Sequence, residues 1–274
     1  MPSACLQSQA TLHFSYSEES KRTRLAKRQL GGLSHISKGY WDDELLSIQL
    51  VNPTAGLFGG DKLEIEIDLA EQSNVAITSP SATRFHTMAD DAQAEVNQHI
   101  TLAADSHLDY WPEMLIPQRG AHAVQRSSIH LSPSSSLLLL DSLAPGRVAH
   151  GEINAYRTYQ NHFDLFIDGE LRVRERLNLT PENQVLPMST PDWEACYMAN
   201  LWCYDSKIEV SEKVLAQELK QELGPYAAVS DLGEGLYIFR LLAPKSVTFH
   251  KQVKTLRSIL KNLGFCKNVD FRKL

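Results

Sequence analysis

The stretch that decides the fold is Asn52-Pro-Thr-Ala-Gly-Leu-Phe-Gly-Gly-Asp-Lys-Leu-Glu-Ile-Glu-Ile-Asp-Leu69. In its second half every second residue is Leu or Ile, and the residues between them are mostly acidic. Successive side chains of a strand point to opposite faces, so this alternation predicts a strand with one buried face. Gly59 and Gly60 come just before Asp61. Because glycine adopts positive φ easily, this turn either directs the Asp61 carboxylate towards a specific partner or simply starts the strand.

Three similar segments follow one another along the chain, at residues 67–77, 100–110 and 129–139. Each is a strand that ends in Leu, a polar turn that ends in Ser, and a second strand. The interval of roughly thirty residues lies in the range of stacked repeats, which bury a continuous core only by packing on one another. The alternative is a chance similarity among unrelated hairpins.

A segment that contains proline follows each repeat, at residues 78–86, 111–120 and 141–147. Proline and glycine favour turns, so we expect the chain to leave the strand at each of these points. The segments also hold many polar side chains, and loops on a rigid scaffold often carry function.

We predict a mainly β fold in which stacked β repeats build a body that resembles a β-superhelix. Residues 1–179 form this body with its hairpin-like repeats. Residues 180–192 contain three prolines and are expected to form a linker or long loop. Residues 193–274 form a small α/β layer that packs on the body. We expect the body and the layer to form one integrated domain.

The predicted C-terminal layer contains two helices, at residues 211–223 and 247–263. Apolar residues recur at helical spacing in both, and each segment is followed by a glycine, which commonly ends a helix. Ser211 and Ser246 are the expected N-caps.

Composition excludes several classes of protein. The net charge of -6 argues against general nucleic-acid binding, and no apolar run approaches the ~20 residues needed to span a membrane. The four cysteines are scattered and the N-terminus lacks a secretory pattern, so we expect a cytoplasmic protein with reduced thiols. The basic run at residues 21–28 is interpreted as an exposed strand edge, with a protein-docking surface as the alternative.

No nucleophile, phosphate-binding or zinc-protease motif is present, so we predict that the protein is not an enzyme. Oxygen ligands with imidazole suit a divalent ion that is held loosely and released quickly. The candidate residues for such transient binding are Asp61, His86, Asp141, Glu152, Glu170 and Glu175. Arg147 could pair with Glu152 or Asp141 and hold its loop rigid, a structural role like that expected of Gly59 and Gly60.

Residues 52–61, 78–86, 115–118 and 140–152 together resemble the urease accessory protein family UreD, also called UreH. The resemblance covers about residues 23–179. It implies a predominantly β scaffold and metallochaperone component without enzymatic activity. Such a protein binds urease apoprotein and UreF, which engages the GTPase UreG, so that nickel is inserted into the urease active site.

The resemblance also implies a path for nickel in transit, without a tightly bound cofactor. Carried over residue by residue, Asp61, Asp141 and Glu175 are the expected path residues. The sequence departs from the family pattern at Asn52, where many members have His, and at His86, where Tyr is usual. Asn in place of His removes one plausible ligand, which His86 could replace.

The residues leave two other functions open. A metal-dependent hydrolase on a β scaffold would use Asp61, His86 and Asp141, although the chain shows no closed ligand set. A ligand-binding module that recognises carbohydrate or peptide would need an exposed aromatic ladder, and the four tryptophans fall at unrelated phases. A scaffold with large docking faces should be poorly soluble alone and rescued by its partner.

Overall fold

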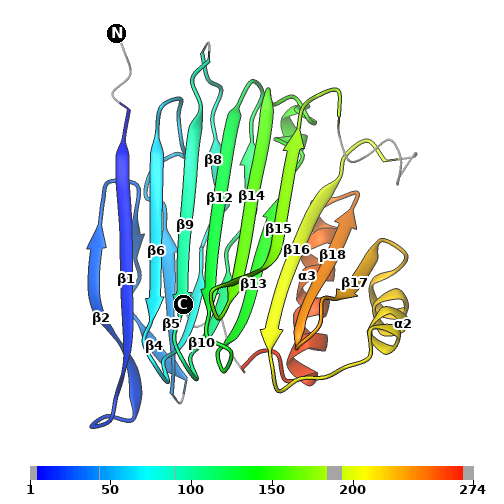
Figure 1. The fold of residues 1–274 in the computed structure, drawn as a ribbon. Coiled ribbons are helices and arrows are strands. Elements are labelled where there is room, and N and C mark those ends of the chain that lie inside the picture. The colour runs from blue at the N-terminus through cyan, green and yellow to red at the C-terminus, as the bar shows by residue number, and fades with distance from the viewer. Residues whose placement is uncertain (1–4, 43, 90, 184–192, 268–274) are drawn as a thin grey trace.

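The computed structural model describes residues 5–42, 44–89, 91–183 and 193–267. Within these residues the chain forms two β-sheets that lie face to face (Figure 1). The seven-stranded sheet has the strand order β15-β14-β12-β9-β6-β1-β2. Its strands are β1 (Gln7–Ser17), β2 (Arg22–Leu30), β6 (Lys62–Leu69), β9 (Ala94–Leu102), β12 (His122–Leu131), β14 (Thr158–Ile167) and β15 (Glu170–Leu179).

The eleven-stranded sheet has the main strand order β17-β18-β16-β13-β10-β7-β5-β3, with three short strands beside this path. Its strands are β3 (His35–Ile36), β4 (Tyr40–Asp42), β5 (Leu45–Val51), β7 (Asn74–Thr78), β8 (Thr83–Phe85), β10 (His107–Trp111), β11 (Leu115–Pro117), β13 (Ser136–Leu143), β16 (Tyr197–Asp205), β17 (Ala227–Asp231) and β18 (Leu236–Ala243). The described helices are the short 3-10 helix η1 (Val148–His150), α2 (Glu212–Leu223) and α3 (Ser246–Asn262).

The strands coil into a β-solenoid of about four turns, which confirms the prediction of stacked β repeats. Strands β6, β9, β12 and β14 pair in parallel in one sheet, and β5, β7, β10 and β13 do so in the other. The two strands of each repeat therefore lie in different sheets, so each unit is an arch between the sheets and not the expected hairpin-like unit. Alternation shows which face of a strand is buried, but it does not identify the strand that pairs with it.

The serine that ends each polar turn explains why the repeat is visible in the sequence. Ser73, Ser106 and Ser135 are at most 1% exposed, and the N–H of each donates to the carbonyl three residues earlier. The turns also stack on one another, because the N–H of His107 donates to Ser73 O and that of Ser136 to Ser106 O, both at 2.8 Å. A small side chain is required where successive turns contact each other.

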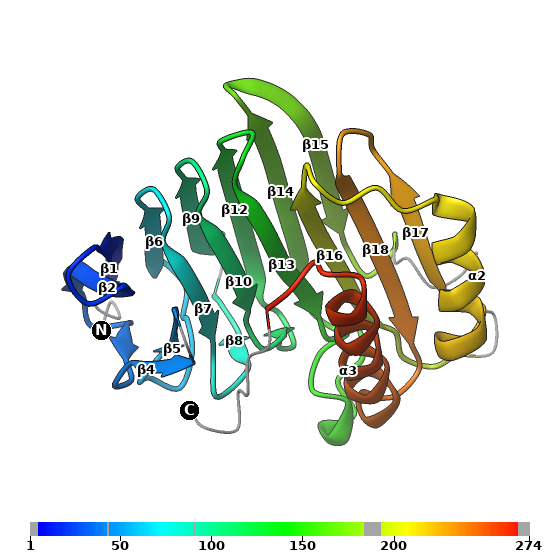
Figure 2. The ribbon, with the colours of Figure 1, turned by 90° about the horizontal axis from the view of Figure 1, so that it is seen from below.

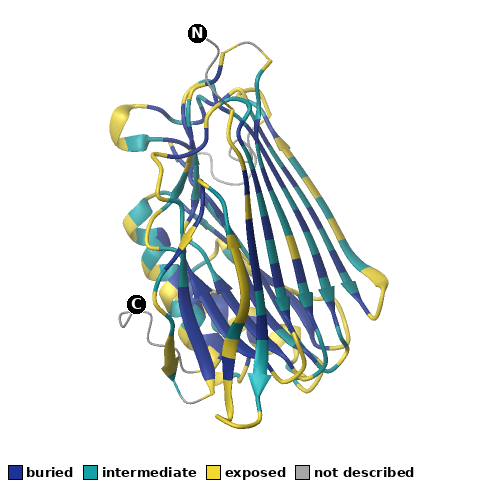
Figure 3. Ribbon diagram, turned by 90° about the vertical axis from the view of Figure 1, so that its left-hand side faces the viewer, coloured by how far each residue is buried: buried dark blue, intermediate teal, exposed yellow. Residues whose placement is uncertain are grey.

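The main hydrophobic core lies between the two sheets. In β6, Leu63, Ile65, Ile67 and Leu69 are at most 6% exposed and point into it, as their alternation predicts. The residues between them are half-buried on the outer face of the seven-stranded sheet, and the same alternation runs along its neighbours (Figure 3).

A second core lies on the other face of the eleven-stranded sheet, where α2 and α3 pack (Figure 2). Strands β16, β18 and β17 extend this sheet with antiparallel pairing, and they supply much of the surface that the helices cover. Both predicted helices are present. Ser211 is the N-cap of α2, as predicted, whereas Lys245 is the N-cap of α3 because the extended backbone ends there, so Ser246 is the first helical residue.

The basic run forms most of β2, an edge strand of the seven-stranded sheet, which confirms the predicted charged edge. Most of the predicted linker, residues 184–192, lies outside the described residues. The hairpin at Asp168 and Gly169 joins β14 to β15 in antiparallel pairing. None of the helices in the described part of the chain is long and apolar enough to cross a membrane.

Candidate functional site

A cavity of about 70 Å³ lies between the two sheets. Residues of both sheets line it, including the apolar side chains of Ile65, Tyr110 and Phe163. Several polar side chains also face it: Asn52, Thr78, Gln98, Gln125, Ser127 and Asp141. A cavity of this size holds more than one water molecule, and polar walls are what buried water requires.

Asp141 of β13 and Glu113 are the two acidic residues that line this cavity. Asn161 Nδ2 donates to Asp141 Oδ2 at 2.5 Å, and Gln125 Nε2 donates to Asp141 Oδ1 at 3.3 Å. Both partners are neutral amides, so neither of them offsets the charge of the carboxylate. Burial therefore raises the pKa of Asp141 to about 6, although the two amides act in the opposite direction. The negative charge of Glu175 adds to the increase in this pKa.

Glu175 lies on β15, an edge strand of the seven-stranded sheet. Arg240 binds both of its carboxylate oxygens, with Nη1 at 2.9 Å from Oε1 and Nη2 at 2.7 Å from Oε2. Arg240 Nη1 also donates to Asn200 Oδ1 at 2.8 Å. This arrangement ties a strand of the seven-stranded sheet to two strands of the eleven-stranded sheet. An open groove, lined among others by Glu175, Trp202 and Arg240, lies beside it.

Strand register connects these two polar groups. Asp141 on β13 is the direct partner of Asn200 on β16, which in turn is the partner of Arg240 on β18. Partners in a sheet lie side by side on the same face. Asp141, Asn200 and Arg240 therefore form one polar row across the eleven-stranded sheet, from the cavity to the groove at Glu175.

Asp61 has a different environment, although it is also buried at 3% exposure. Its Oδ1 accepts a hydrogen bond from Leu6 N and its Oδ2 accepts one from Phe58 N, both at 2.8 Å. Gly60, at φ 90°, forms the preceding turn, and a Cβ there would lie 2.3 Å from Cys5 Sγ. The Gly-Gly-Asp turn thus holds the start of β1 against β6, and both carboxylate oxygens serve that structural purpose.

His86 directly follows β8, and its N–H donates to Leu57 O at 2.9 Å. Its ring stacks on Phe58, with centroids 4.3 Å apart, and its Nε2 lies 3.0 Å from Ala55 O. Asn52, in the loop that contains Ala55, uses its Oδ1 to accept hydrogen bonds from Thr54 N and Oγ1, at 2.9 and 2.7 Å. Its buried Nδ2 has no hydrogen-bond partner in the part of the chain that the structure describes.

Arg147 and Glu152 form the pair that the sequence suggested. Arg147 Nε lies 2.8 Å from Glu152 Oε2, and Nη2 lies 2.5 Å from Oε1. Glu152 also accepts a hydrogen bond from Arg119 N at 3.2 Å. The hydrogen bonds from Arg147 hold the pKa of Glu152 at about 2, so the pair keeps the loop around η1 in place over the whole physiological range.

The structure therefore brings two of the predicted metal-path residues into one region and places the other two elsewhere. Asp141 and Glu175 belong to one polar region, whereas Asp61 and His86 lie in the loop region around residues 52–61. Among the described residues, none of the four belongs to a group of three potential ligands at metal-binding distance. The described residues that do form such a group are His13, Glu66 and Asp68.

Sequence reasoning missed the neutral partners of Asp141. Asn161 is buried in β14 at a position where its neighbours on the same face, Tyr159 and Phe163, are apolar. A polar residue in the apolar phase of an alternating strand is a signal that could have identified it. Asn200 interrupts the pattern of β16 less clearly, because that strand is buried on both faces.

These features define a β-solenoid scaffold with a polar row through its interior and loops at one end. Comparison with known proteins identifies its family. The model of the UreD urease accessory protein family matches residues 8–268, and the chain belongs to this family.

The chain is 32% identical to Urease accessory protein UreD of Opitutus terrae over 244 residues, which cover 88% of this chain and 89% of that protein. It is 30% identical to Urease accessory protein UreD of Klebsiella aerogenes over 254 residues, which cover 92% of this chain and 91% of that protein. These relatives are named as accessory proteins and not as enzymes.

Proposed function

We propose that this protein is a cytoplasmic scaffold and metallochaperone component that assists nickel insertion into urease. It binds urease apoprotein and UreF, and it reaches UreG through UreF. Nickel is the cargo and passes through the protein without becoming a resident cofactor. The family assignment supports involvement with urease, and the Asp141 row supports a passage for the ion.

The observation that carries the proposal is a half-buried carboxylate whose hydrogen-bond partners among the described residues are neutral. Asp141 faces a cavity with polar and apolar walls and accepts hydrogen bonds from two amides, and within the same described residues the buried Asn161 Oδ1 beside it has no hydrogen-bond partner. Isolated buried charges are unfavourable, so a protein gains little stability from such a group. Oxygen ligands of this kind bind a divalent ion weakly and release it quickly, as a passage requires.

Glu175 would act at the outlet of the passage. Its carboxylate is 24% exposed and is shared with Arg240, which is 47% exposed. An exposed ion pair of this kind is weak enough to open when a divalent cation competes for the carboxylate. The cation would then meet the side-chain oxygens of Asp141, Asn200 and Glu175 in turn, and the Arg240 side chain would move towards the groove.

Co-expression with UreF and UreG tests the proposed assembly. The complex is purified through a tag on this chain and supplied with urease apoprotein, nickel and GTP. We expect a stoichiometric complex that activates urease. A soluble lone protein that ignores both partners would contradict the accessory function, and a search for enzymatic turnover would then be warranted.

A matched pair of variants separates assembly from transfer. Glu175→Gln removes the carboxylate at the proposed outlet, and Asp164→Asn removes a carboxylate that is also 24% exposed and paired with arginine but lies on the outer face. Both variants should retain the complex, and only Glu175→Gln should slow activation. Equal activation by both would remove Glu175 from the path.

A further inference from the structure

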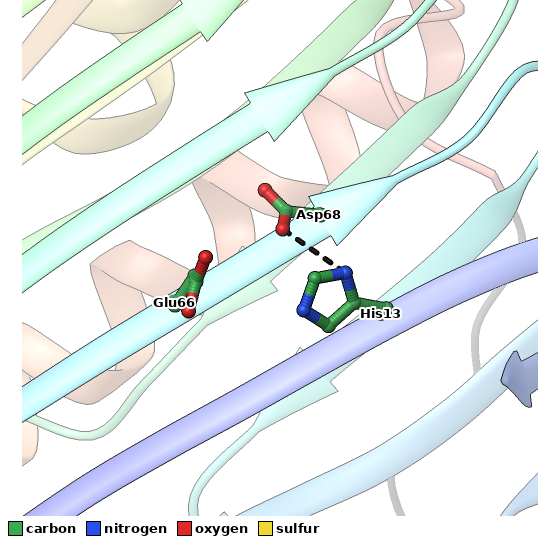
Figure 4. Close-up of side chains that lie close together, drawn as sticks. All are labelled: His13, Glu66 and Asp68. Atoms are coloured by element: carbon green, nitrogen blue, oxygen red, sulfur yellow. Dashed lines mark ion pairs between the residues drawn. The ribbon is translucent and has the colours of Figure 1, made fainter. Parts of the chain in front are cut away.

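Three potential metal ligands meet on the outer face of the seven-stranded sheet, away from the interior path. They are His13 on β1 and Glu66 and Asp68 on β6 (Figure 4). One ligand atom from each lies within 4.8 Å of the other two. All three side chains belong to half-buried residues, so they are reachable from solvent and still restrained by their neighbours.

The parallel pairing of β1 with β6 brings these residues together. His13 is the direct partner of Asp68, and Thr11 is the direct partner of Glu66. His13 Nδ1 lies 3.2 Å from Asp68 Oδ2. Residues two apart on a strand share a face, which places Glu66 beside this pair. The residues between them point into the core, so the backbone that carries the three ligands is anchored.

Hydrogen bonding orients Glu66. Thr11 Oγ1 donates to Glu66 Oε2 at 3.1 Å, which leaves Oε1 available. On the other side of β6, His99 of β9 is the register partner of Glu66 and packs at 5.0 Å from the ring of His130. The neighbours of the Glu66 carboxylate on this face are therefore imidazoles and a hydroxyl group.

The charge balance distinguishes this cluster from the rest of the same face. Other carboxylates there have basic partners: Glu64 pairs with Lys62, Glu95 with Arg126, and Asp164 with Arg174 and Arg176. Within the described residues, by contrast, Glu66 and Asp68 have no ion pair with Lys or Arg, and only the imidazole of His13 approaches Asp68. Lys27 of β2 is the register partner of His13 but forms no ion pair with either carboxylate. Two carboxylates therefore lie close together without a Lys or Arg ion-pair partner among the described residues, a situation that a divalent cation relieves.

We propose that His13, Glu66 and Asp68 bind one divalent transition-metal ion, such as Zn²⁺ or Ni²⁺, on the outer face of the solenoid. One imidazole and two carboxylates provide three ligands and leave further positions for water. This ligand set suits a borderline metal ion better than Ca²⁺ or Mg²⁺, which prefer oxygen alone. The inference does not rest on the proposed function, because it concerns different residues on a different face.

Direct binding measurements test the site. Zn²⁺ or Ni²⁺ is titrated into the full chain by calorimetry, and Co²⁺ is added separately to record the visible absorption of a nitrogen- and oxygen-ligated ion. The Asp141→Asn variant supplies the background, so that binding in the interior is not counted. We expect one ion per chain in this background and Co²⁺ absorption that excess Zn²⁺ abolishes.

Substitutions then assign the ligands. Added to the Asp141→Asn background, His13→Gln, Glu66→Gln and Asp68→Asn should each weaken binding by at least about tenfold, because altering even the groups around metal ligands has effects of this size. Asp164→Asn removes the same charge from the same face and should leave the affinity unchanged. Circular dichroism confirms that each variant is folded.

Two results would overturn the proposal. One is the absence of binding and of Co²⁺ absorption in the background protein, which would make the cluster an ion pair only. The other is equal affinity in the three ligand variants and in Asp164→Asn. Urease activation is measured in parallel, and its loss or retention bears on the proposed function without altering either conclusion.

Discussion

Asp109 and Asp141 lie on neighbouring strands of the eleven-stranded sheet, but they face opposite sides, and Asp109 is fully buried whereas Asp141 is half-buried. Asp109 on β10 faces the helices, where Arg257 of α3 forms a two-pronged ion pair with it, Nη1 lying 3.0 Å from Oδ1. The Arg257 guanidinium also lies 4.6 Å from the centre of the Trp111 ring. Asp141 on β13 faces the other sheet and has only neutral amide partners.

The difference between these aspartates separates a structural role from a functional one. A buried carboxylate with a permanent cation has its charge satisfied and fixes one element against another. A half-buried carboxylate with neutral partners, facing a cavity, keeps the capacity to bind a cation that arrives from outside. Asp109 and Asp141 share a sheet and differ in burial, and the charge of their partners gives them their different roles.

Breaking the Asp109 pair should have the largest effect on stability. Removing one member leaves an uncompensated buried charge, so Asp109→Ala or Arg257→Ala should lower the free energy of unfolding by about 3–5 kcal/mol. Urea denaturation measures this change. Replacing both residues together, as Asp109→Leu with Arg257→Met, should recover much of the loss; a double variant as unstable as the singles would contradict the ion-pair explanation.

Substitution of Asp61 should destabilise the protein, as expected for Asp109 and in contrast to Asp141. Asp61→Ala removes hydrogen bonds to two backbone N–H groups, and charge-assisted bonds contribute about 1.5–3 kcal/mol each. We expect the free energy of unfolding to fall by about 3 kcal/mol, the lower end of the range for two such bonds. The measurement is urea denaturation at neutral pH. A variant that keeps wild-type stability but loses nickel transfer would contradict this structural role and indicate that Asp61 binds nickel in transit.

Asp141→Asn should change stability in the opposite direction. The folded pKa of Asp141 is raised from 3.8 to about 6, so the ionised carboxylate disfavours folding above that pH. The unfavourable effect is fully present above pH 6 and disappears as the pH falls towards 3.8. The Asn variant should therefore be more stable than the wild type at pH 7.5, and the difference should shrink below pH 6. Unfolding curves at several pH values measure it, and a difference that is independent of pH would refute the assignment.

Glu175→Gln should have the smallest effect on stability. The Glu175–Arg240 pair is partly exposed, and ion pairs of this type contribute at most about 1 kcal/mol. Asp164→Asn, the matched control, should be similar. Thermal unfolding of the two variants gives the comparison. A loss several times larger for Glu175→Gln would show that this pair holds the sheets together and is not a gate.

Much of the solenoid could be predicted from the sequence because its signals are local. The alternation in β6 and the recurrent turn serines identify the strands and their stacking, and helical spacing identifies α2 within one residue. Parallel pairing between units could not be predicted, because alternation is the same for an arch and for a hairpin.

The site was only partly predictable because its contacts are long-range. The resemblance indicated Asp141 and Glu175, but the partners of Asp141 lie on two other strands and Arg240 lies 65 residues beyond Glu175 in the chain. The His13–Asp68 contact likewise depends on pairing between strands 55 residues apart. No local pattern contains such information.

The most direct test of the central claim is the nickel content of urease after activation by complexes that carry Asp141→Ala or Asp164→Ala. Both variants lose one carboxylate, but only Asp141 lies in the interior path. We expect Asp141→Ala to keep the partner complex and to lower nickel incorporation by about tenfold or more, as expected when a metal ligand is lost, while Asp164→Ala matches the wild type. Equal nickel incorporation by the two complexes would contradict a metal path through the interior of the solenoid.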